Sequence, residues 1–469
     1  MLFPTMQFGL FFLAVYAITW SFGRDNVARK WFLLLASWAF YAAWDWRFVG
    51  LLIASGLLNW WTAERIDAAQ TSRRRKAWVA LGVAINLTIL GFFKYYGFFV
   101  EQLSALLTQV GWERDLPLLE IILPVGISFY TFQGISYVVD VHRRVTPKAD
   151  SVGDVMLLMS FFPHLVAGPI VRASHLLPQF ERTPKLSRTL VAHGLVLIAW
   201  GLAKKMIFAT ELATRVVDPV FFDPSAYGAA DLALAAYAYA VQIYCDFSAY
   251  SDIAVGVAAL LGYRFPRNFD QPYRATSLQE FWRRWHISLS SWLRDYLYIP
   301  LGGGRGPVWR TCINLMITML LGGIWHGAAW TFVAWGALHG GVLTLERLWR
   351  AARKEAARRA PAIIGLLVTF HVVLLSWILF RSESFEAVRQ YFVAFASNPA
   401  TPTLLTPFVL VLVVGGLGLH ALPSRAGEGA ARLLARLPSP AAALVFAFAL
   451  LLIEAVRPQG VAPFIYFQF

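Results

Sequence analysis

A histidine inside an apolar segment is the first candidate for chemistry in this sequence. His326 lies within the apolar stretch 311–345, in the run 321–327, which is LGGIWHG. Ionisable groups at membrane depth are costly to bury and are candidates for function. A neutral imidazole there is able to act as a general base. The alternative is a structural histidine bonded to a helix carbonyl, and the glycines beside it are equally consistent with close helix packing.

A second cluster combines tryptophans and arginines over 280–296. At helical spacing its apolar side chains share one face, and the basic ones lie off that face, so we expect one amphipathic helix at the membrane surface. This helix is either an anchor with snorkelling arginines or a site for a phosphate-bearing acyl donor such as a coenzyme or carrier pantetheine. His286 lies in the middle of it. The apolar face holds Trp282, Trp285, Leu289 and Trp292, and the arginines are Arg283, Arg284 and Arg294.

Two carboxylates form a third cluster inside the apolar stretch 232–262. Asp246 and Asp252 are six residues apart, with Ser248 between them. Six residues do not bring two side chains to one helix face, so these are not an obvious acid/base pair. We expect them to pair with arginines or with polar backbone. The sequence has no metal-spaced histidine pair and only two cysteines, Cys245 and Cys312, so no metal site is predicted.

The composition indicates which elements hold these residues. Of the 469 residues, 58% are hydrophobic and 14% are charged, against about 25% charged in soluble domains. This excludes an ordinary soluble enzyme and a disordered chain. A membrane helix needs about 20 apolar residues, so there is room for roughly a dozen spans. Apolar stretches without strand-like alternation lie at 6–20, 31–61, 79–100, 121–141, 152–171, 190–210, 232–262, 311–345, 362–380, 404–421 and 440–456. The predicted fold is therefore all-α, a polytopic helical bundle.

Loop charges predict the orientation of the spans. Loops 62–78, 264–310 and 346–360 hold five, eight and six basic residues against two, three and two acidic ones. Cation-rich loops face the cytoplasm, which also accounts for the net charge of +14 without a nucleic-acid partner. Segments 101–120 and 211–231 each hold one arginine and four acidic residues, including Glu113 and Asp115, and face the other side.

Two segments have cation-rich loops on both flanks and are predicted to be re-entrant. The stretch 152–171 contains Pro163, Gly168 and Pro169 and is expected to enter and leave on the cytoplasmic side. The stretch 311–345 is too short for two crossings, which need about 40 residues. Its tip, with His326, is therefore expected near the middle of the bilayer.

Together these motifs resemble the membrane-bound O-acyltransferase superfamily, in particular its bacterial alginate O-acetyltransferase-like branch. The resemblance covers most of the chain, best from about 90 to 380, and weakens over 381–469. It rests on the order and number of the motifs, because any one alone is weak. These are the segments 123–133, 163–169, 246–252, 281–290, 325–327 and 463–469.

The resemblance implies that His326 matches the family's catalytic histidine and His286 its second polar position, and that donor and acceptor approach a central funnel from opposite faces. We predict both histidines to be catalytic residues, with His286 either polarising the thioester carbonyl or orienting a substrate. The donor is a cytoplasmic thioester, acetyl-CoA or an acyl carrier, used as a substrate, with no tightly bound cofactor. The acceptor is a hydroxyl of an exported polysaccharide such as alginate. A periplasmic acetyltransferase or polysaccharide-modifying protein is the expected partner. The predicted substrate-binding residues are Trp325, Trp282, Arg283, Arg284, Asp246 and Ser248.

Other interpretations remain open at this stage. D-alanyl or other acyl transfer to a cell-envelope polymer is one, and a non-catalytic acyl or glycan transporter or a membrane scaffold is another. We expect a multi-pass protein of the bacterial inner membrane with a single membrane domain. Within it, 1–90 supplies N-terminal spans, 91–380 the acyltransferase core and 381–469 C-terminal spans.

Overall fold

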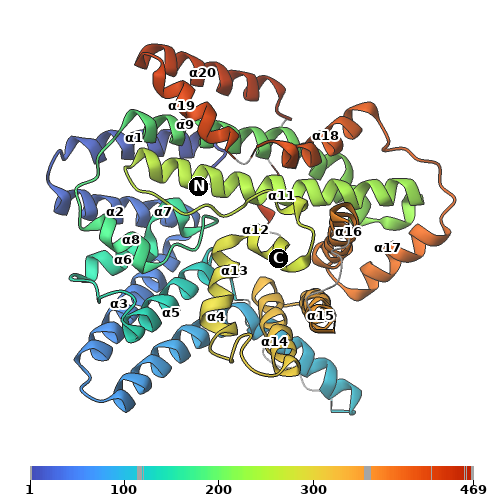
Figure 1. The fold of residues 1–469 in the computed structure, drawn as a ribbon, viewed down its shortest axis with the longest axis horizontal. Helices are drawn as coiled ribbons and strands as arrows, with labels where there is room; N and C mark the ends of the chain where they lie inside the picture. The colour runs from blue at the N-terminus through green and yellow to red at the C-terminus, as the bar shows by residue number, and fades with distance from the viewer. Residues whose placement is uncertain are drawn as a thin grey trace. The chain divides into compact units, whose positions relative to one another are not determined.

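Every regular element in the described part of the chain is a helix (Figure 1). The computed structural model describes residues 3–112, 119, 121–352, 361–423, 425–458, 460 and 462–465. Glu113 and Asp115, used above for orientation, lie outside this set. Among the described residues, six helical segments are long and apolar enough to cross a membrane, and the bent pair from Pro407 to Arg436 makes a seventh if it forms a single span. The predicted all-α, multi-pass membrane fold is confirmed. The six segments are Ser72–Gln109, Arg188–Phe222, Ala229–Leu260, Val308–His326, Ala362–Arg381 and Ser439–Val456.

The chain forms two compact units, and the first comprises Met1–Gly194 with Ala254–Pro266. Its helices are α1 (Met6–Ser21), α2 (Asn26–Asp45), η1 (Trp46–Phe48), α3 (Val49–Ala68), α4 (Ser72–Gln109), α5 (Ile127–Arg143), α6 (Val152–Ser160), α7 (Phe162–Leu165) and α8 (Ala173–Phe180). Within 152–171, neither α6 nor α7 is long enough to span a bilayer, as the re-entrant prediction requires. His164 is buried there and donates from Nε2 to the Leu158 carbonyl oxygen at 2.9 Å. This is a packing role.

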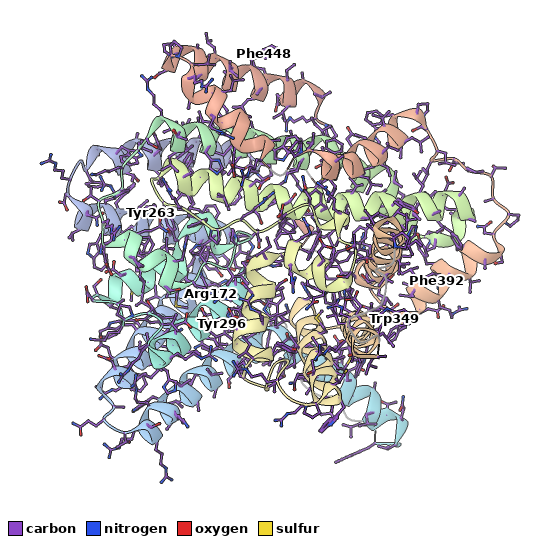
Figure 2. The ribbon with its side chains drawn as sticks, viewed as in Figure 1. Arg172, Tyr263, Tyr296, Trp349, Phe392 and Phe448 are labelled. Carbon is purple, nitrogen blue, oxygen red and sulfur yellow. The ribbon has the colours of Figure 1, made fainter. Side chains whose placement is uncertain are left out.

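The second unit comprises Leu195–Ile253 and Arg267–Phe469, and the division between units passes through α9 (Arg188–Ala203) and α11 (Ala229–Leu260). Figure 2 labels two of its exposed aromatic side chains, Phe392 and Phe448. Its other helices are η2 (Lys204–Thr210), η3 (Ala213–Val217), α10 (Asp218–Phe222), η4 (Pro224–Ala226), η5 (Pro272–Arg274), α12 (Leu278–Arg284), α13 (Ile287–Leu293), η6 (Arg294–Tyr298), α14 (Val308–His326), α15 (Trp330–Ala352), α16 (Ala362–Arg381), α17 (Phe385–Ser397), α18 (Pro407–Gly418), η7 (Leu419–Ala421), α19 (Ala426–Arg436) and α20 (Ser439–Val456).

Helices α14 and α15 form the predicted hairpin, and glycines let their backbones touch. A methyl group at Gly323 would overlap the carbonyl oxygen of Phe332, and one at Gly336 would lie against the Met319 carbonyl. Close approach of this kind is the usual role of small residues between membrane helices. The hairpin turn follows directly after His326, the last residue of α14.

The expected length of this hairpin was wrong. Its two arms extend to Val308 and Ala352, beyond the apolar stretch 311–345, because their outer turns are polar. The 19 residues of α14 measure about 28 Å, close to the hydrocarbon thickness of about 30 Å. Length alone therefore does not hold His326 at the middle of the bilayer, and its depth stays a prediction.

Candidate active site

His326 lies in an aromatic cage at the hairpin turn. Its side chain is 5% exposed. The imidazole lies 5.0 Å from the ring of Trp325, 5.0 Å from that of Trp335 and 5.2 Å from that of Phe380, measured between ring centroids. Helices α14, α15 and α16 each supply part of this cage. The surroundings are water-poor, a condition in which electrostatic interactions with a substrate are strengthened.

The region around His286 differs from the single amphipathic helix expected for 280–296. Helix α12 ends at Arg284, Trp285 is extended, and His286 has a left-handed backbone with φ of 42° before α13 begins. The expectation of a surface helix was wrong as well, because Trp285, Leu289 and Trp292 are buried in the protein. The break turns His286 inward, where it is 0% exposed.

His286 is connected to His326 through Trp325. The Trp325 ring lies 6.4 Å from the His286 ring and 5.0 Å from the His326 ring. Phe247 of α11 packs edge-on against His286 at 4.6 Å. Burial lowers the pKa of His286, which lies outside the candidate spans, to about 3. The imidazole is therefore neutral at physiological pH.

Trp282 leads to a third histidine, His339, which the sequence analysis missed. The indole Nε1 of Trp282 donates to His339 Nδ1 at 3.3 Å, and His339 Nε2 meets the Ser376 hydroxyl at 3.0 Å. Both ring nitrogens of His339 are thus engaged within the protein. Its position inside the apolar stretch 311–345 could have identified His339 as a candidate. Because both of its ring nitrogens have partners within the protein, we assign it a structural role.

The two arginines of α12 differ in their surroundings. Arg283 is exposed, whereas Arg284 pairs with Glu280 at 2.8 Å and donates to the Asp270 carbonyl at 3.2 Å. Ser277 caps this helix by accepting from the Glu280 amide at 3.1 Å. Arg284 therefore ties α12 to the preceding loop, and Arg283 is the one of the two with its charge directed to solvent.

Asp246 and Asp252 pair with lysines, so the expectation of arginine partners was wrong, whereas the expected backbone partner is present for Asp246, in the Ile465 amide. Lys205 Nζ lies 2.8 Å from Asp246, and Lys204 Nζ lies 2.7 Å from Asp252. Lys204 also donates to the Ser248 hydroxyl at 2.6 Å. Both lysines belong to η2, a π-helical segment. Two adjacent lysines inside the apolar stretch 190–210 are costly to bury unpaired, and this feature could have identified them as partners of the two carboxylates.

The chain segment 463–465 is also part of this region. The Ile465 amide donates to Asp246 at 3.0 Å, and the Pro463 carbonyl accepts from Lys205 at 3.3 Å. The Phe464 ring lies 5.9 Å from Phe247, which in turn contacts His286. Sequence reasoning carried no site residue into 381–469 and missed this contact.

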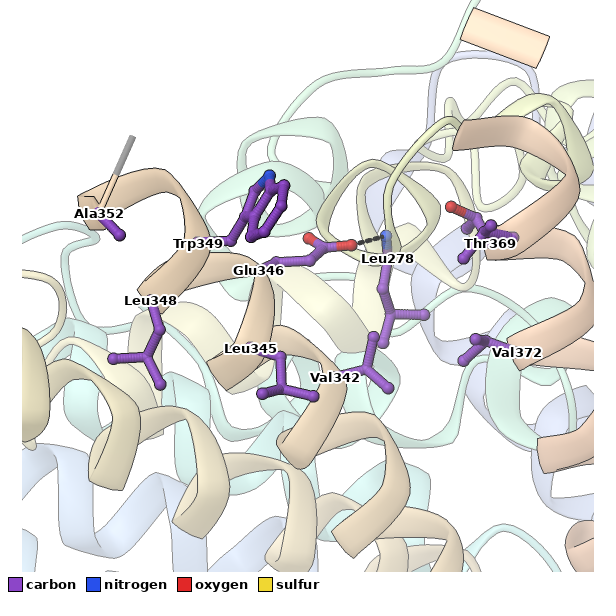
Figure 3. A pocket seen from close by; sticks show the side chains of 10 residues that line it. Leu278, Val342, Leu345, Glu346, Leu348, Trp349, Ala352, Thr369 and Val372 are labelled. Carbon is purple, nitrogen blue, oxygen red and sulfur yellow. Dashed lines mark hydrogen bonds between the residues drawn. The ribbon is translucent and has the colours of Figure 1, made fainter. Parts of the chain in front are cut away.

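An apolar groove of about 580 Å³ lies between α15 and α16 (Figure 3). Glu346 lines it and accepts from the Leu278 and Gln279 amides at 2.5 and 3.3 Å. The carboxylate satisfies the free amides at the start of α12, which is a favourable place for negative charge. This contact fixes α12 to the hairpin. The groove lining is Leu278, Val342, Leu345, Glu346, Leu348, Trp349, Ala352, Val368, Thr369 and Val372.

The described site thus brings together His326, His286, Trp325 and Trp282 in one aromatic cluster. Asp246 and Ser248 flank Phe247, which contacts His286, but their own polar atoms are engaged by lysines. The substrate-binding roles assigned to these residues stay predictions. The central funnel stays a prediction as well.

Comparisons with known proteins agree with the motifs. The chain is 40% identical over 482 residues to the probable alginate O-acetylase AlgI of Azotobacter vinelandii, covering 94% of this chain and 95% of the relative. It is 35% identical to the peptidoglycan O-acetyltransferase of Helicobacter pylori, covering 83% and 79%. It is 26% identical to the teichoic acid D-alanyltransferase of Bacillus subtilis, covering 56% and 69%.

A family model extends these matches to the region that holds both histidines. It describes the membrane-bound O-acyltransferase family and matches residues 151–385, a range that includes α11 to α16 and the whole aromatic cluster. The helical membrane fold, the relatives along most of the chain and the histidine at the hairpin turn agree, and this protein belongs to the membrane-bound O-acyltransferase family.

Proposed function

We propose that this O-acyltransferase moves an acetyl group from a cytoplasmic thioester to hydroxyl groups of an exported polysaccharide of the alginate type, and that it does so in the bacterial inner membrane. The observation that carries this proposal is the buried imidazole of His326 at the turn of the α14–α15 hairpin, inside the region matched by the family model. The acceptor follows from the relative named as an alginate O-acetylase.

The chemistry assigned to His326 is general base catalysis. Its neutral imidazole takes the proton of the acceptor hydroxyl while the oxygen bonds to the thioester carbonyl carbon. The carbon–sulfur bond then breaks, and the imidazolium returns the proton to the departing thiolate. The products are an O-acetyl ester and a free thiol, and His326 is regenerated. Such a base contributes roughly 10² to 10⁴ in rate.

The remaining predicted residues surround this step. Trp325 and Trp282 form apolar walls for the acyl group and its pantetheine arm. Arg283, whose guanidinium is exposed, holds a donor phosphate. Asp246 and Ser248 act indirectly, by fixing the part of α11 that presses Phe247 against His286. The expected partner is a periplasmic acetyltransferase or polysaccharide-modifying protein that acts on the same polysaccharide.

The test is acetyl transfer by purified protein in proteoliposomes. Labelled acetyl-CoA or an acetylated carrier is added on one side and polysaccharide on the other, and label in the polysaccharide is counted. His326→Ala should lower transfer by about 100-fold or more. His371→Ala is the matched control, because His371 is exposed on α16 and bonds Tyr237 away from the cage. Full transfer by a folded His326→Ala protein would contradict the proposal.

D-alanyl transfer is the second candidate, suggested by the Bacillus subtilis relative. The same assay with a D-alanylated carrier separates the two, because the proposal expects label transfer from the acetyl donor alone. A protein that moved label across the membrane without forming an ester would instead be a transporter.

A further inference from the structure

Asn268 holds the imidazole of His286 from the loop before α12. Its side-chain oxygen Oδ1 lies 3.2 Å from His286 Nδ1, 3.1 Å from the Ser288 amide nitrogen and 2.9 Å from the Ser288 hydroxyl. Its Nδ2 donates to the Ser251 hydroxyl of α11 at 3.0 Å. Asn268 is 2% exposed and His286 is 0% exposed. All these atoms belong to the second unit.

The orientation of the Asn268 amide determines which nitrogen of His286 carries the proton. A backbone amide such as that of Ser288 is only a donor, so the Asn268 atom facing it must be the oxygen. That same oxygen faces His286 Nδ1, and two acceptors do not bond each other. The Ser288 hydroxyl lies 3.4 Å from Nδ1, but it donates its hydrogen to the Asn268 oxygen at the shorter distance of 2.9 Å. Nδ1 of the neutral imidazole therefore carries the hydrogen, and Nε2 carries the lone pair.

The remaining nitrogen is placed for a substrate. His286 Nε2 is buried and has no hydrogen-bond partner among the described residues. Buried polar atoms are almost always paired, so an unpaired one requires an explanation. Aromatic rings pack against this imidazole, whose ring centroid lies 4.6 Å from that of Phe247 and 6.4 Å from that of Trp325. Trp325 also contacts His326, so the two imidazoles share one aromatic neighbour.

We propose that Asn268 is a positioning residue that fixes His286 with Nε2 unprotonated, so that His286 accepts a hydrogen bond from the acceptor hydroxyl. This rests on the proposed function for the identity of the hydroxyl. It excludes the other role open to His286, polarisation of the thioester carbonyl, because that role needs a hydrogen on Nε2. Asn268 thereby makes His286 the hydrogen-bond acceptor for the hydroxyl and leaves general base catalysis to His326.

The tautomer is measured directly by solid-state NMR of the full-length protein with ¹³C,¹⁵N-labelled histidine in lipid bilayers. The His286 signals are identified by their loss in His286→Gln. We expect a pyrrole-type nitrogen at Nδ1 and a pyridine-type nitrogen at Nε2. Asn268→Asp retains the acceptor oxygen and should keep this pattern, whereas Asn268→Leu should lose it. A protonated Nε2 in the unaltered protein would overturn the proposal.

Kinetics separate positioning from folding. Asn268→Leu should lower kcat by about 10- to 100-fold, the usual effect of removing a group that orients a functional side chain, with the donor KM unchanged. Asn268→Asp should restore most of kcat. Asn314→Leu is the control, because Asn314 is a buried asparagine that donates to the Gly303 carbonyl at 3.0 Å and contacts neither histidine. An equal loss of kcat in Asn314→Leu would assign Asn268 a structural role only. The NMR experiment tests the His286 tautomer whether or not the acceptor is a polysaccharide. The positioning role of Asn268 and the proposed function can therefore be disproved independently of each other.

Discussion

His286 combines a left-handed backbone with complete burial of its imidazole. A non-glycine residue in that conformation costs about 1–2 kcal/mol, and such positions persist where surrounding contacts hold them. Here the Ile287 amide donates to the Asn268 carbonyl at 2.8 Å, and the Ser288 amide donates to the Asn268 side chain. The same asparagine thus caps α13 and orients the imidazole.

The buried imidazole of His286 predicts a pH dependence of stability. Its pKa of about 3 in the folded protein is below the value of about 6.5 in an unfolded chain. Below pH 6.5 the unfolded state therefore binds more protons, and stability falls by up to about 1.4 kcal/mol per pH unit. The melting temperature in detergent should drop less between pH 7 and pH 5 for His286→Gln than for the unaltered protein. Equal drops would show that folding leaves the pKa of this imidazole near its value in the unfolded chain.

Arg283 and Arg284 should respond differently to substitution. Arg283→Gln should raise the donor KM more than the acceptor KM, because its exposed charge is available to a donor phosphate. Arg284→Gln should mainly lower the melting temperature, because this side chain pairs with Glu280 within α12 and ties the helix to the Asp270 carbonyl of the preceding loop. Saturation curves for donor and acceptor with each variant check this. An unchanged donor KM in Arg283→Gln would leave that arginine a membrane-surface role.

At the scale of elements, the α14–α15 hairpin depends on contact between two backbones. Gly323→Ala would push a methyl group into the Phe332 carbonyl and should cost about 1–3 kcal/mol. The neighbouring Gly322→Ala is the control, because a methyl there would meet only the end of the Leu293 side chain at 3.3 Å. Thermal unfolding and acetyl transfer should both fall for Gly323→Ala alone. Similar values for the two variants would mean that the hairpin tolerates separation of its helices.

The sequence predicts the elements better than their interruptions. The hairpin with His326 at its turn follows from an apolar stretch between two cation-rich loops. The break at Trp285 and His286 has no local signal, because neither glycine nor proline occurs there. The partner that holds it is Asn268, which accepts from the Ile287 and Ser288 amides and is a residue type that is ordinary in a polar loop. The lysine partners of Asp246 were missed because pairing depends on which helices meet, and composition does not determine that.

At the scale of the whole molecule, loop charges predict which face each loop occupies. In a background with Cys245 and Cys312 replaced, Arg310→Cys and Trp349→Cys should react only with a membrane-impermeant thiol reagent on the cytoplasmic side. Phe222→Cys should react only from the opposite side. All three positions are exposed. Labelling of the first two from opposite faces would mean that the chain between them crosses the membrane only once, and the predicted re-entrant hairpin would be wrong.

The paired lysines of η2 have a consequence for how the chain enters the membrane during synthesis. Each lysine at the centre of a span costs about 2.5–3.5 kcal/mol on insertion scales, and Lys204 and Lys205 lie near the middle of Arg188–Phe222. Their partners on α11 are made later, so this segment should leave the translocon stably only together with α11. Asp246→Asn with Asp252→Asn should therefore reduce the inserted fraction in an in vitro translation assay with microsomes. Gln242→Ala, on the same helix, should leave the inserted fraction unchanged. Equal insertion of the unaltered chain, the double variant and Gln242→Ala would mean that the lysines insert without help from the aspartates.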